Sequence, residues 1–316
     1  MHLTEFKKIL IIISTKSNNY KKIENKISKK FNDIFKNNIN KRFEIILSKD
    51  KYSISNESKK FAENNNSNQS LLIIVGGDGS ISEAVNQIYH TNINFSFLPN
   101  GTGNDFSKTV YGKLKFDEIL DNIENIKIEK IDLLKINEKV SINVASFGYE
   151  SIVLKKSLQI KENFPALGSL SFMLGVIFTL NKIQKYNFEY ELIMDNGEIV
   201  QGEKEYMLTA ICNGKYYGGG FNPAPYASIT DGIADINAVE YVSISKLLRV
   251  ISLYKDHRHL SVKESRNYKV ISGKYKRKDN STFIGNIDGN IEEFKEVNFK
   301  ILPKQLNLGI FKLFMV

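Results

Sequence analysis

The sequence of 316 residues contains a single cysteine, Cys212, so an internal disulfide is excluded and a reducing compartment is expected. It contains four histidines, and no cysteine stands near the close pair His257 and His259, so a metal site there is not favoured. The phosphate-binding motif GxxxxGK[ST] does not occur. Any phosphate site in this chain must therefore be built from a different kind of loop.

Long apolar runs are missing as well. The apolar residues 9–13 are too few for the core of a secretory signal. The longest uncharged stretch, residues 163–181, is at the lower length limit for crossing a bilayer and contains several small polar residues. We therefore expect a cytoplasmic protein, with peripheral membrane association left open, rather than a membrane-spanning one.

The charge is unbalanced towards the positive side. Lysine and arginine number 44 against 35 aspartates and glutamates, which gives a net charge of +9. Such a surface favours anionic partners, namely a nucleotide, a nucleic acid or an acidic membrane face. An ordinary solvated, lysine-rich surface explains the same excess without any partner.

The most informative stretch is residues 71–89, LLIIVGGDGSISEAVNQIY. The apolar run at its start predicts a buried strand of a parallel sheet. Glycines at 76, 77 and 79 permit a tight turn and let a ligand approach the backbone. Ser80 and Glu83 have the spacing of a capping box, which predicts the start of a helix there. A strand, a glycine turn and a helix N-terminus can bind phosphate, although a plain strand-to-helix connection has the same pattern.

A second glycine turn follows the next apolar run, residues 95–98, with the sequence PNGTGNDF. Two such turns at the carboxyl ends of successive parallel strands are expected side by side, where open α/β sheets bind ligands. Thr102 offers a hydroxyl to a nucleotide. Asn104 and Asp105 either contact the ligand or cap the next helix.

The fold class predicted from these patterns combines two domains. Residues 1–125 alternate strand and helix four times, which predicts a Rossmann-like parallel α/β domain. Residues 126–316 contain short strands, one of them expected over 140–147, and a hairpin signal at Asp195-Asn196-Gly197. They predict a β-sandwich domain with helices near 151–160, 167–183 and 245–254. We expect an active-site cleft between the domains, and we expect the last residues to pack back on the first domain.

The pair GGDGS and LPNGTGNDFS resembles the catalytic domain of the diacylglycerol kinase family, in particular the soluble bacterial lipid kinases. These are also related to sphingosine kinases and, distantly, to NAD kinases. The segments NVASFGY (143–149) and CNGKYYGGGFNPAPYASITDGI (212–233) are similar to the family too. The resemblance implies ATP and Mg²⁺ as cofactors and diacylglycerol or a related lipid, met at a membrane surface, as substrate. It implies no nucleic acid partner and leaves a homodimer open.

The resemblance also implies roles for individual residues. Those expected to bind ATP are Gly76, Gly77, Asp78, Gly79 and Ser80 of GGDGS and Gly101, Thr102, Gly103, Asn104 and Asp105 of GTGND. Beside the resemblance, Glu83 is expected either to cap the helix or to contact the ribose of the nucleotide. Asp78 and Asp105 are expected to take part in an aspartate–water–Mg²⁺ network. A Mg²⁺ ion is expected on the Asp231 carboxylate and the main-chain oxygens of Ser228 and Ile233, since hard oxygens suit this ion.

Two segments depart from the family pattern. The family's first strand usually leads into Asn-Pro, whereas here it leads into STKSN, residues 14–18. The family motif Asp-Gly-Glu, whose carboxylates are assigned to deprotonating the lipid hydroxyl, reads Asp288-Gly289-Asn290 here. An amide is not a useful proton acceptor. We therefore expect Asp288, with Asp78, to be catalytic, and keep Glu292 as an alternative base.

Three interpretations follow from the sequence. The favoured one is an ATP-dependent lipid kinase. The others are a NAD kinase, which shares GGDG, and a nucleotide- or lipid-binding homologue with impaired catalysis, which Asn290 motivates. The apolar residues 164–180 either wall a groove for acyl chains or form a buried core helix.

Overall fold

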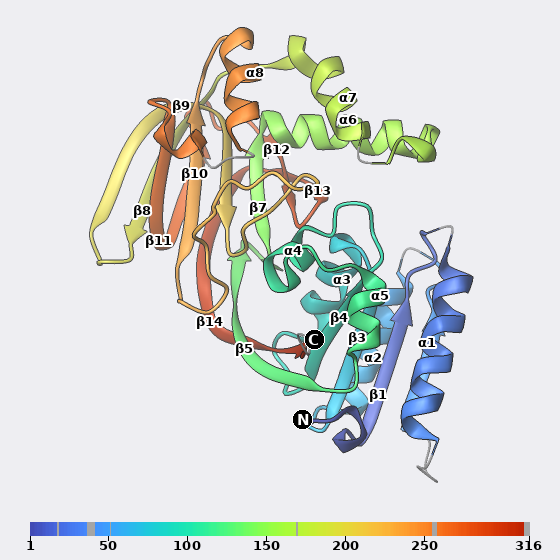
Figure 1. Ribbon diagram of the computed structural model, residues 1–316. Coiled ribbons are helices and arrows are strands. Elements are labelled where there is room, and N and C mark those ends of the chain that lie inside the picture. The colour runs from blue at the N-terminus through green and yellow to red at the C-terminus, as the bar shows by residue number, and fades with distance from the viewer. Residues whose placement is uncertain (18, 37–41, 51, 169, 255–257, 313–316) are drawn as a thin grey trace. The chain divides into compact units, whose positions relative to one another are not determined.

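The computed structural model describes residues 1–17, 19–36, 42–50, 52–168, 170–254 and 258–312. Asn18 and His257, both considered above, lie outside these residues. The chain divides into two compact units, and Figure 1 labels most of their helices and strands. Unit 1 comprises Met1–Ile131 together with Lys304–Val316, and unit 2 comprises Asp132–Pro303.

Unit 1 is a parallel sheet with helices between its strands. The strands pair in the order β2-β1-β3-β4, and every pair among them is parallel. This confirms the predicted α/β class. In chain order the elements are a 3₁₀ turn Leu3–Glu5, β1 Lys8–Ile13, α1 Tyr20–Phe35, β2 Phe43–Leu47, α2 Ser53–Asn64, β3 Ser70–Gly76, α3 Asp78–Ile88, β4 Asn94–Pro99, α4 Asp105–Tyr111, α5 Phe116–Asp121 and β5 Ile126–Ile136, which continues into unit 2.

The apolar runs become strands because both faces of this sheet are covered. All seven residues of β3 and five of the six in β1 are buried, as expected for central strands of a parallel sheet. Helix α1 covers the sheet with one apolar face, made by Ile23, Ile27, Phe31 and Phe35. The lysines of α1 lie between these positions and are exposed or partly exposed.

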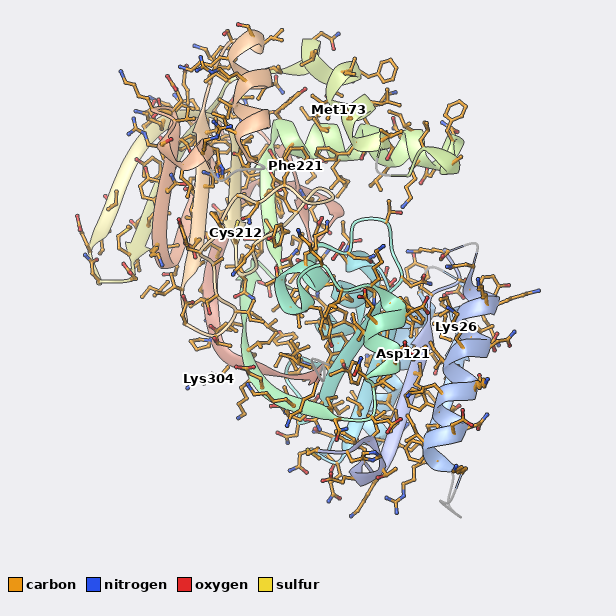
Figure 2. All side chains as sticks on the ribbon, viewed as in Figure 1. Lys26, Asp121, Met173, Cys212, Phe221 and Lys304 are labelled. Atoms are coloured by element: carbon orange, nitrogen blue, oxygen red, sulfur yellow. The ribbon has the colours of Figure 1, made fainter. Side chains whose placement is uncertain are left out.

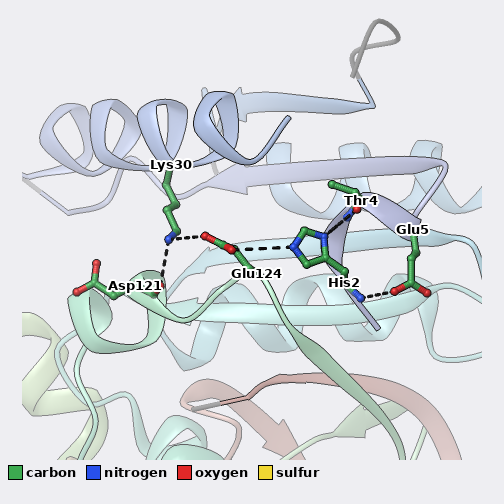
Figure 3. A network of polar contacts seen from close by, with 6 residues as sticks. All are labelled: His2, Thr4, Glu5, Lys30, Asp121 and Glu124. Carbon is green, nitrogen blue, oxygen red and sulfur yellow. Dashed lines mark hydrogen bonds and ion pairs between the residues drawn. The ribbon is translucent and has the colours of Figure 1, made fainter. Parts of the chain in front are cut away.

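The N-terminal residues are held by a small polar network, shown in Figure 3. Lys30 of α1 donates to the main-chain oxygen of Asp121 at 3.1 Å and pairs with Glu124 at 3.0 Å. Glu124 lies 4.0 Å from the imidazole of His2. Because these side chains are partly exposed, each contact is worth only about 0.2–1 kcal/mol, and the network serves to align the chain end.

The last strand, β14 Glu296–Phe311, supplies a further partner for the sheet of unit 1. Its Asn307 and Leu308 pair in parallel with Asn94 and Phe95 of β4. The hydroxyl of Ser96 donates to the main-chain oxygen of Gly309 at 2.6 Å. The described residues from Lys304 onward are thereby part of unit 1 rather than of the β-rich unit 2.

Unit 2 is β-rich, as predicted. Strands β8, β9, β10 and β11 pair in a closed cycle, each with two of the others, and β7, β12 and β13 extend it from β9. The elements are β6 Lys139–Ser141, β7 Val144–Gly148, α6 Tyr149–Asn163, a 3₁₀ turn Pro165–Leu167, α7 Leu170–Thr179, a 3₁₀ turn Leu180–Lys182, β8 Tyr186–Met194, β9 Ile199–Cys212, β10 Ala234–Glu240, α8 Ile244–Leu253, a 3₁₀ turn Arg258–Ser261, β11 Ser265–Arg277, β12 Phe283–Ile287 and β13 Asn290–Phe294.

Aromatic side chains fill the core of this β-sandwich. Phe147 packs edge to face on Phe188, Tyr275 and Phe283, with ring centroids 5.1–5.4 Å apart. Such pairs add to the free energy of burial. The Asp195-Asn196-Gly197 hairpin is confirmed between β8 and β9, since Ile193 pairs with Ile199 across it.

The single strand predicted over residues 140–147 is wrong. The structure has two strands, β6 and β7, separated at Ile142 and Asn143. The amide groups of these two residues donate to the carboxylate of Asp288 instead of to a neighbouring strand. A side chain 145 residues away along the sequence from Asn143 therefore decides where the strand breaks.

No helix among the described residues combines the length and apolarity that a bilayer crossing requires.

Candidate functional site

The two predicted glycine turns touch each other in unit 1. Gly76 at the end of β3 pairs with Pro99 at the end of β4, and the amide of Asn100 donates to Gly76 O at 2.8 Å. A Cβ atom on Gly101 would lie 2.5 Å from the Cα atom of Gly77, closer than any side chain tolerates. Glycine is thus required where the two turns meet, and the predicted neighbourhood of residues 76–80 and 101–105 is present.

Asp78 joins the two turns through hydrogen bonds. Its carboxylate accepts from the amides of Asp105 at 3.0 Å and Phe106 at 2.9 Å, which begin α4. Asn104 occupies the N-cap position of α4 without a capping bond. Its side chain instead accepts from the amide of Gly101 at 2.8 Å and donates to the oxygen of that residue. Asp78 therefore orients the second turn, and Asn104 closes it.

The capping box predicted at Ser80 and Glu83 is wrong. Helix α3 begins at Asp78, with Gly77 as its N-cap, and the amide of Ser80 donates to Gly77 O at 3.0 Å. The chain turns into the helix directly after the glycines, so Ser80 already lies inside the first turn, where it is buried. Glu83 lies further along α3, with its carboxylate 3.8 Å from the ammonium group of Lys16.

The remaining residues of the second turn surround a pair of carboxylates. A Cβ atom on Gly103 would lie 3.3 Å from the Oδ2 atoms of both Asp78 and Asp105. Asp105 also binds Lys108 at 2.7 Å, while Thr102 is exposed at the tip of the turn. Two carboxylates facing one glycine offer the oxygen donors that a hydrated Mg²⁺ ion prefers.

The end of β1 lies beside the first turn. A Cβ atom on Gly76 would lie 3.3 Å from Cβ of Ser14. The hydroxyl of Thr15 donates to the main-chain oxygen of Ser48 at 2.8 Å, so it is engaged within the fold. Lys16 has a side chain that is 68% exposed. Among the described residues of the segment that replaces the family's Asn-Pro, Lys16 is the exposed one.

In unit 2, Asp288 occupies the turn between β12 and β13 with φ +48°. Its buried carboxylate accepts four hydrogen bonds, from the hydroxyl of Ser141 at 2.6 Å and the amides of Ile142, Asn143 and Val144 at 3.0–3.1 Å. Four donors hold this carboxylate in place, and it in turn fixes residues 141–144. The catalytic role expected for Asp288 stays a prediction.

The other carboxylate considered, Glu292, lies on β13 two residues after Asn290. Successive side chains of a strand alternate between its faces, so Asn290 and Glu292 share one face of this hairpin. Glu292 forms an ion pair with Lys139. The position at which the family has a glutamate carries an amide, and the nearest carboxylate on that face already has a cationic partner.

The three predicted Mg²⁺ ligands belong to one turn of unit 2. The exposed carboxylate of Asp231 accepts from the amide of Ile233 at 3.1 Å, and the hydroxyl of Ser228 lies 3.2 Å from that of Thr230. Among the described residues no cluster of three or more His, Cys, Asp or Glu side chains is placed to hold a metal. A bound ion would thus need main-chain oxygens and water besides Asp231, which fits the hard oxygens that Mg²⁺ takes.

Asp132 is a residue of this region that the sequence analysis missed. It is fully buried, its Oδ2 atom accepts from the amide of Gly232 at 2.7 Å, and its own amide donates to Ile229 O at 2.7 Å. Asn213 adds a hydrogen bond to Asp132 O at 2.9 Å. Asp132 therefore fixes the turn that carries Asp231. The sequence feature that could have indicated a buried role for Asp132 is its place as the one carboxylate in the strand sequence KIDLL, residues 130–134.

Glu150, at the start of α6, is another buried carboxylate. Burial raises its pKa from 4.5 to about 7, although the hydroxyl of Ser151 donates to its Oε1 atom at 2.9 Å. The Oε2 atom has no hydrogen-bond partner among the described residues. No local pattern in the sequence distinguishes this glutamate from a surface one.

Comparison with known proteins gives a consistent assignment. Residues 8–136 match the "Diacylglycerol kinase catalytic domain", and residues 143–310 match the "YegS C-terminal NAD kinase beta sandwich-like domain". A protein of Staphylococcus epidermidis named "Putative lipid kinase" is 28% identical over 275 residues, which cover 85% of this chain and 86% of that protein. A protein of Staphylococcus carnosus with the same name is 28% identical over 79% of this chain and 81% of its own length.

Solved structures agree in fold. The "Crystal structure of a putative diacylglycerol kinase from Bacillus anthracis str. Sterne" superposes with a TM-score of 0.74 at 19% identity, over 98% of this chain and 96% of that one. The chain therefore belongs to the family in which a diacylglycerol kinase catalytic domain is followed by a YegS-type β-sandwich domain. The family resemblance noted in the sequence is thus confirmed, and this family is one of lipid kinases.

Proposed function

We propose that this protein is an ATP- and Mg²⁺-dependent kinase that transfers the γ-phosphate to the hydroxyl of diacylglycerol or a related lipid. The observation that carries the proposal is the backbone contact between Gly77 and Gly101. It supports a shared phosphate site, because bare backbone and the N-terminus of α3 meet there. Family membership supports the lipid as acceptor.

Phosphoryl transfer depends mainly on positioning and on electrostatic stabilisation, since the transition state is loose. In the proposal, the turns at residues 76–79 and 101–103 hold the phosphates by their amide groups. Lys16, exposed beside them, adds a positive charge to the same edge of the sheet. Asp78 contributes indirectly, because its two hydrogen bonds to the start of α4 keep the second turn in place.

Two places fit a cation. Asp78 and Asp105, which face Gly103, would hold Mg²⁺ through water near the phosphates, and Asp231 with the main-chain oxygens of Ser228 and Ile233 would hold a second ion. When bound, Mg²⁺ neutralises the charge that develops on the phosphate oxygens. Asp132 keeps the Asp231 turn in shape through the amide of Gly232.

For the acceptor hydroxyl, we propose positioning without a strong base. The four hydrogen bonds on Asp288 and the amide at Asn290 favour this assignment. A loose transition state tolerates it, because the hydroxyl proton leaves late. The same two observations favour a second candidate function, in which the protein binds nucleotide and lipid but turns them over very slowly or not at all.

The experiment is transfer of label from γ-labelled ATP to a panel of lipids in mixed detergent micelles, with NAD as a further acceptor. ATP binding is measured separately by calorimetry. The proposal expects labelled lipid from at least one diacyl lipid. ATP binding without transfer to any lipid supports the second candidate, and labelling of NAD alone shows that the lipid assignment is wrong.

A further inference from the structure

Helix α7 exposes several of its large apolar side chains to solvent instead of burying them in the core. Its exposed residues include Leu170, Met173, Ile177 and Phe178, which are 48–62% exposed. Met173 is labelled on this helix in Figure 2. An amphipathic surface helix normally turns such residues towards the core and its small and polar residues outward.

The buried side of α7 is made mostly of small residues instead. Ser171, Gly175 and Thr179 are buried together with one apolar residue, Val176, and a Cβ atom on Gly175 would lie 2.9 Å from the main-chain oxygen of Val153 in α6. The hydroxyl of Thr179 donates to Gly175 O at 2.7 Å. The close approach to α6 therefore depends on the small side, so the helix cannot rotate to bury its large residues.

The apolar surface extends onto α6 and the connection between the helices. Phe164 is 63% exposed and Leu158 is 38% exposed. Because α6 and α7 pack against each other, we group these two residues with the four of α7 and call the set the α6–α7 apolar surface: Leu158, Phe164, Leu170, Met173, Ile177 and Phe178. Exposed apolar groups gathered in this way mark an interaction site rather than scattered surface residues.

The charges around this surface are positive. Residues 149–183 contain four lysines, at 155, 156, 161 and 182, and two acidic residues, of which Glu150 is buried. The ammonium group of Lys156 lies 6.0 Å from the ring centroid of Phe178. Apolar side chains flanked by lysines are the pattern of helices that lie in the interface of an anionic bilayer.

Helix α7 also contacts the loop between β9 and β10, which contains Gly218, Gly219 and Gly220. Phe172 packs against Phe221 with ring centroids 5.2 Å apart, and a Cβ atom on Gly218 would lie 3.2 Å from the Phe172 ring. That loop continues to the Asp231 turn, at which the proposed function places a cation. The apolar surface is thus connected, within unit 2, to residues of the proposed site.

We propose that the α6–α7 apolar surface docks onto the surface of an anionic lipid bilayer, inserting its exposed side chains among the lipids and placing its lysines at the headgroups. The inference rests on the proposed function in one respect, which is that a lipid substrate has to be met in a membrane. Docking itself is measured without any turnover.

The experiment is co-sedimentation with two kinds of sucrose-loaded vesicles. One kind contains phosphatidylcholine alone, and the other contains phosphatidylcholine with about 30% phosphatidylglycerol, an anionic lipid. Wild type is expected to bind the anionic vesicles and to be released by salt. Met173→Ser with Ile177→Ser should lower the partition coefficient at least about tenfold. Ile199→Ser, at a residue 59% exposed on the β8–β9 hairpin, is the matched control and should bind as wild type does.

Charge is tested by a second matched pair. Lys155→Glu with Lys182→Glu should weaken binding to anionic vesicles, whereas Lys59→Glu with Lys60→Glu, an equal change in net charge on α2, should not. Circular dichroism and thermal melting establish that each variant is folded. The inference is overturned if folded Met173→Ser/Ile177→Ser binds as tightly as wild type, or if wild type ignores the vesicles. A change from dimer to monomer in that variant, with vesicle binding unaltered, would instead show a self-association surface.

Kinase assays separate this inference from the proposed function. If docking is right and the function is right, the apolar variant loses transfer to lipid in vesicles but keeps it in detergent micelles. Vesicle binding by a wild type that labels no lipid leaves docking in place and contradicts the kinase. Equal transfer by both proteins in vesicles contradicts docking and leaves the kinase in place.

Discussion

At the scale of single residues, Asp78 and Asp288 show the same physical behaviour in different units. Each carboxylate accepts hydrogen bonds from backbone amides that follow a break in regular structure. Such bonds to a charged group are worth about 1.5–3 kcal/mol each, because the donors would otherwise be buried without a partner. Both aspartates therefore have a structural role, in which each carboxylate holds the backbone of another segment in place.

The first prediction concerns Asp288→Asn. Asparagine tolerates the left-handed backbone at this position, but its NH₂ group faces donors that need an acceptor. We expect the free energy of unfolding to fall by about 2–4 kcal/mol, measured by urea denaturation. If Asp288 acted only as a base, stability would be unchanged while turnover dropped. Asp279→Asn, at an exposed aspartate, is the control.

The second prediction concerns Asn290→Glu, which restores the carboxylate of the family motif. A positioned general base contributes about 10²–10⁴-fold to the rate. We expect kcat for lipid phosphorylation to rise at least about tenfold, while ATP binding by calorimetry stays the same. An unchanged kcat in an active protein would show that this position takes no part in the proton transfer.

The third prediction concerns pH and Glu150. Because burial raises its pKa to about 7, the folded state holds this proton more tightly than the unfolded state does. The contribution to stability is complete below the unfolded pKa and is lost as the pH rises through about 7. Glu150→Gln should match wild type near pH 4.5 and be more stable near pH 8, by up to about 3 kcal/mol.

Urea denaturation at several pH values measures this difference. Burial raises the pKa values of the neighbouring Tyr186 and Tyr254, the Glu150 charge raises both further, and both side chains stay protonated in this range. Glu162→Gln, at an exposed glutamate on the same helix, should leave the pH dependence as in wild type. An identical pH dependence in Glu150→Gln would contradict a buried, protonated glutamate.

At the scale of elements, the ends of β3 and β4 determine the candidate site. Sequence was sufficient to predict that the two glycine turns lie together, because successive apolar runs that each end in glycine predict adjacent parallel strands. The hairpin at Asp195-Asn196-Gly197 was predictable for a similar reason, since its turn chemistry is local.

Other elements depended on contacts that no local pattern encodes. The break between β6 and β7 is set by Asp288, and the turn before β10 by Asp132, which lies 100 residues from its partner Gly232. The prediction for the start of α3 is wrong because the Ser-x-x-Glu spacing is also compatible with a helix whose N-cap lies three residues earlier. The outward apolar side of α7 depends on Gly175 packing against α6, which hydrophobicity alone does not reveal.

The fourth prediction concerns the contact between the turns. Gly101→Ala would place a methyl group 2.5 Å from the Gly77 Cα atom, so the two turns must separate. We expect ATP affinity, measured by calorimetry, to fall at least about tenfold, which corresponds to about 1.4 kcal/mol. Gly197→Ala, in the β8–β9 turn, costs backbone strain of its own but should bind ATP as wild type does.

At the scale of the whole molecule, the residues proposed for nucleotide binding and those proposed for the second cation and for membrane docking lie in different units. The residues assigned to nucleotide, from Gly76 to Asp105, all belong to unit 1, whereas Asp231, Asp288 and the α6–α7 apolar surface belong to unit 2. Strands β5 and β14 each continue from one unit into the other. Loss of stability in either unit is therefore expected to reduce activity, so every variant above needs a measurement of folding beside its measurement of function.

The most direct test of the central claim follows amide signals of the twenty glycines while a non-hydrolysable ATP analogue and Mg²⁺ are added. With glycine-selective ¹⁵N labelling, the account predicts that Gly77, Gly79, Gly101 and Gly103 shift together with one dissociation constant, while Gly197 and Gly202 stay in place. Saturable binding of the analogue that leaves the signals of both glycine turns unmoved would contradict it.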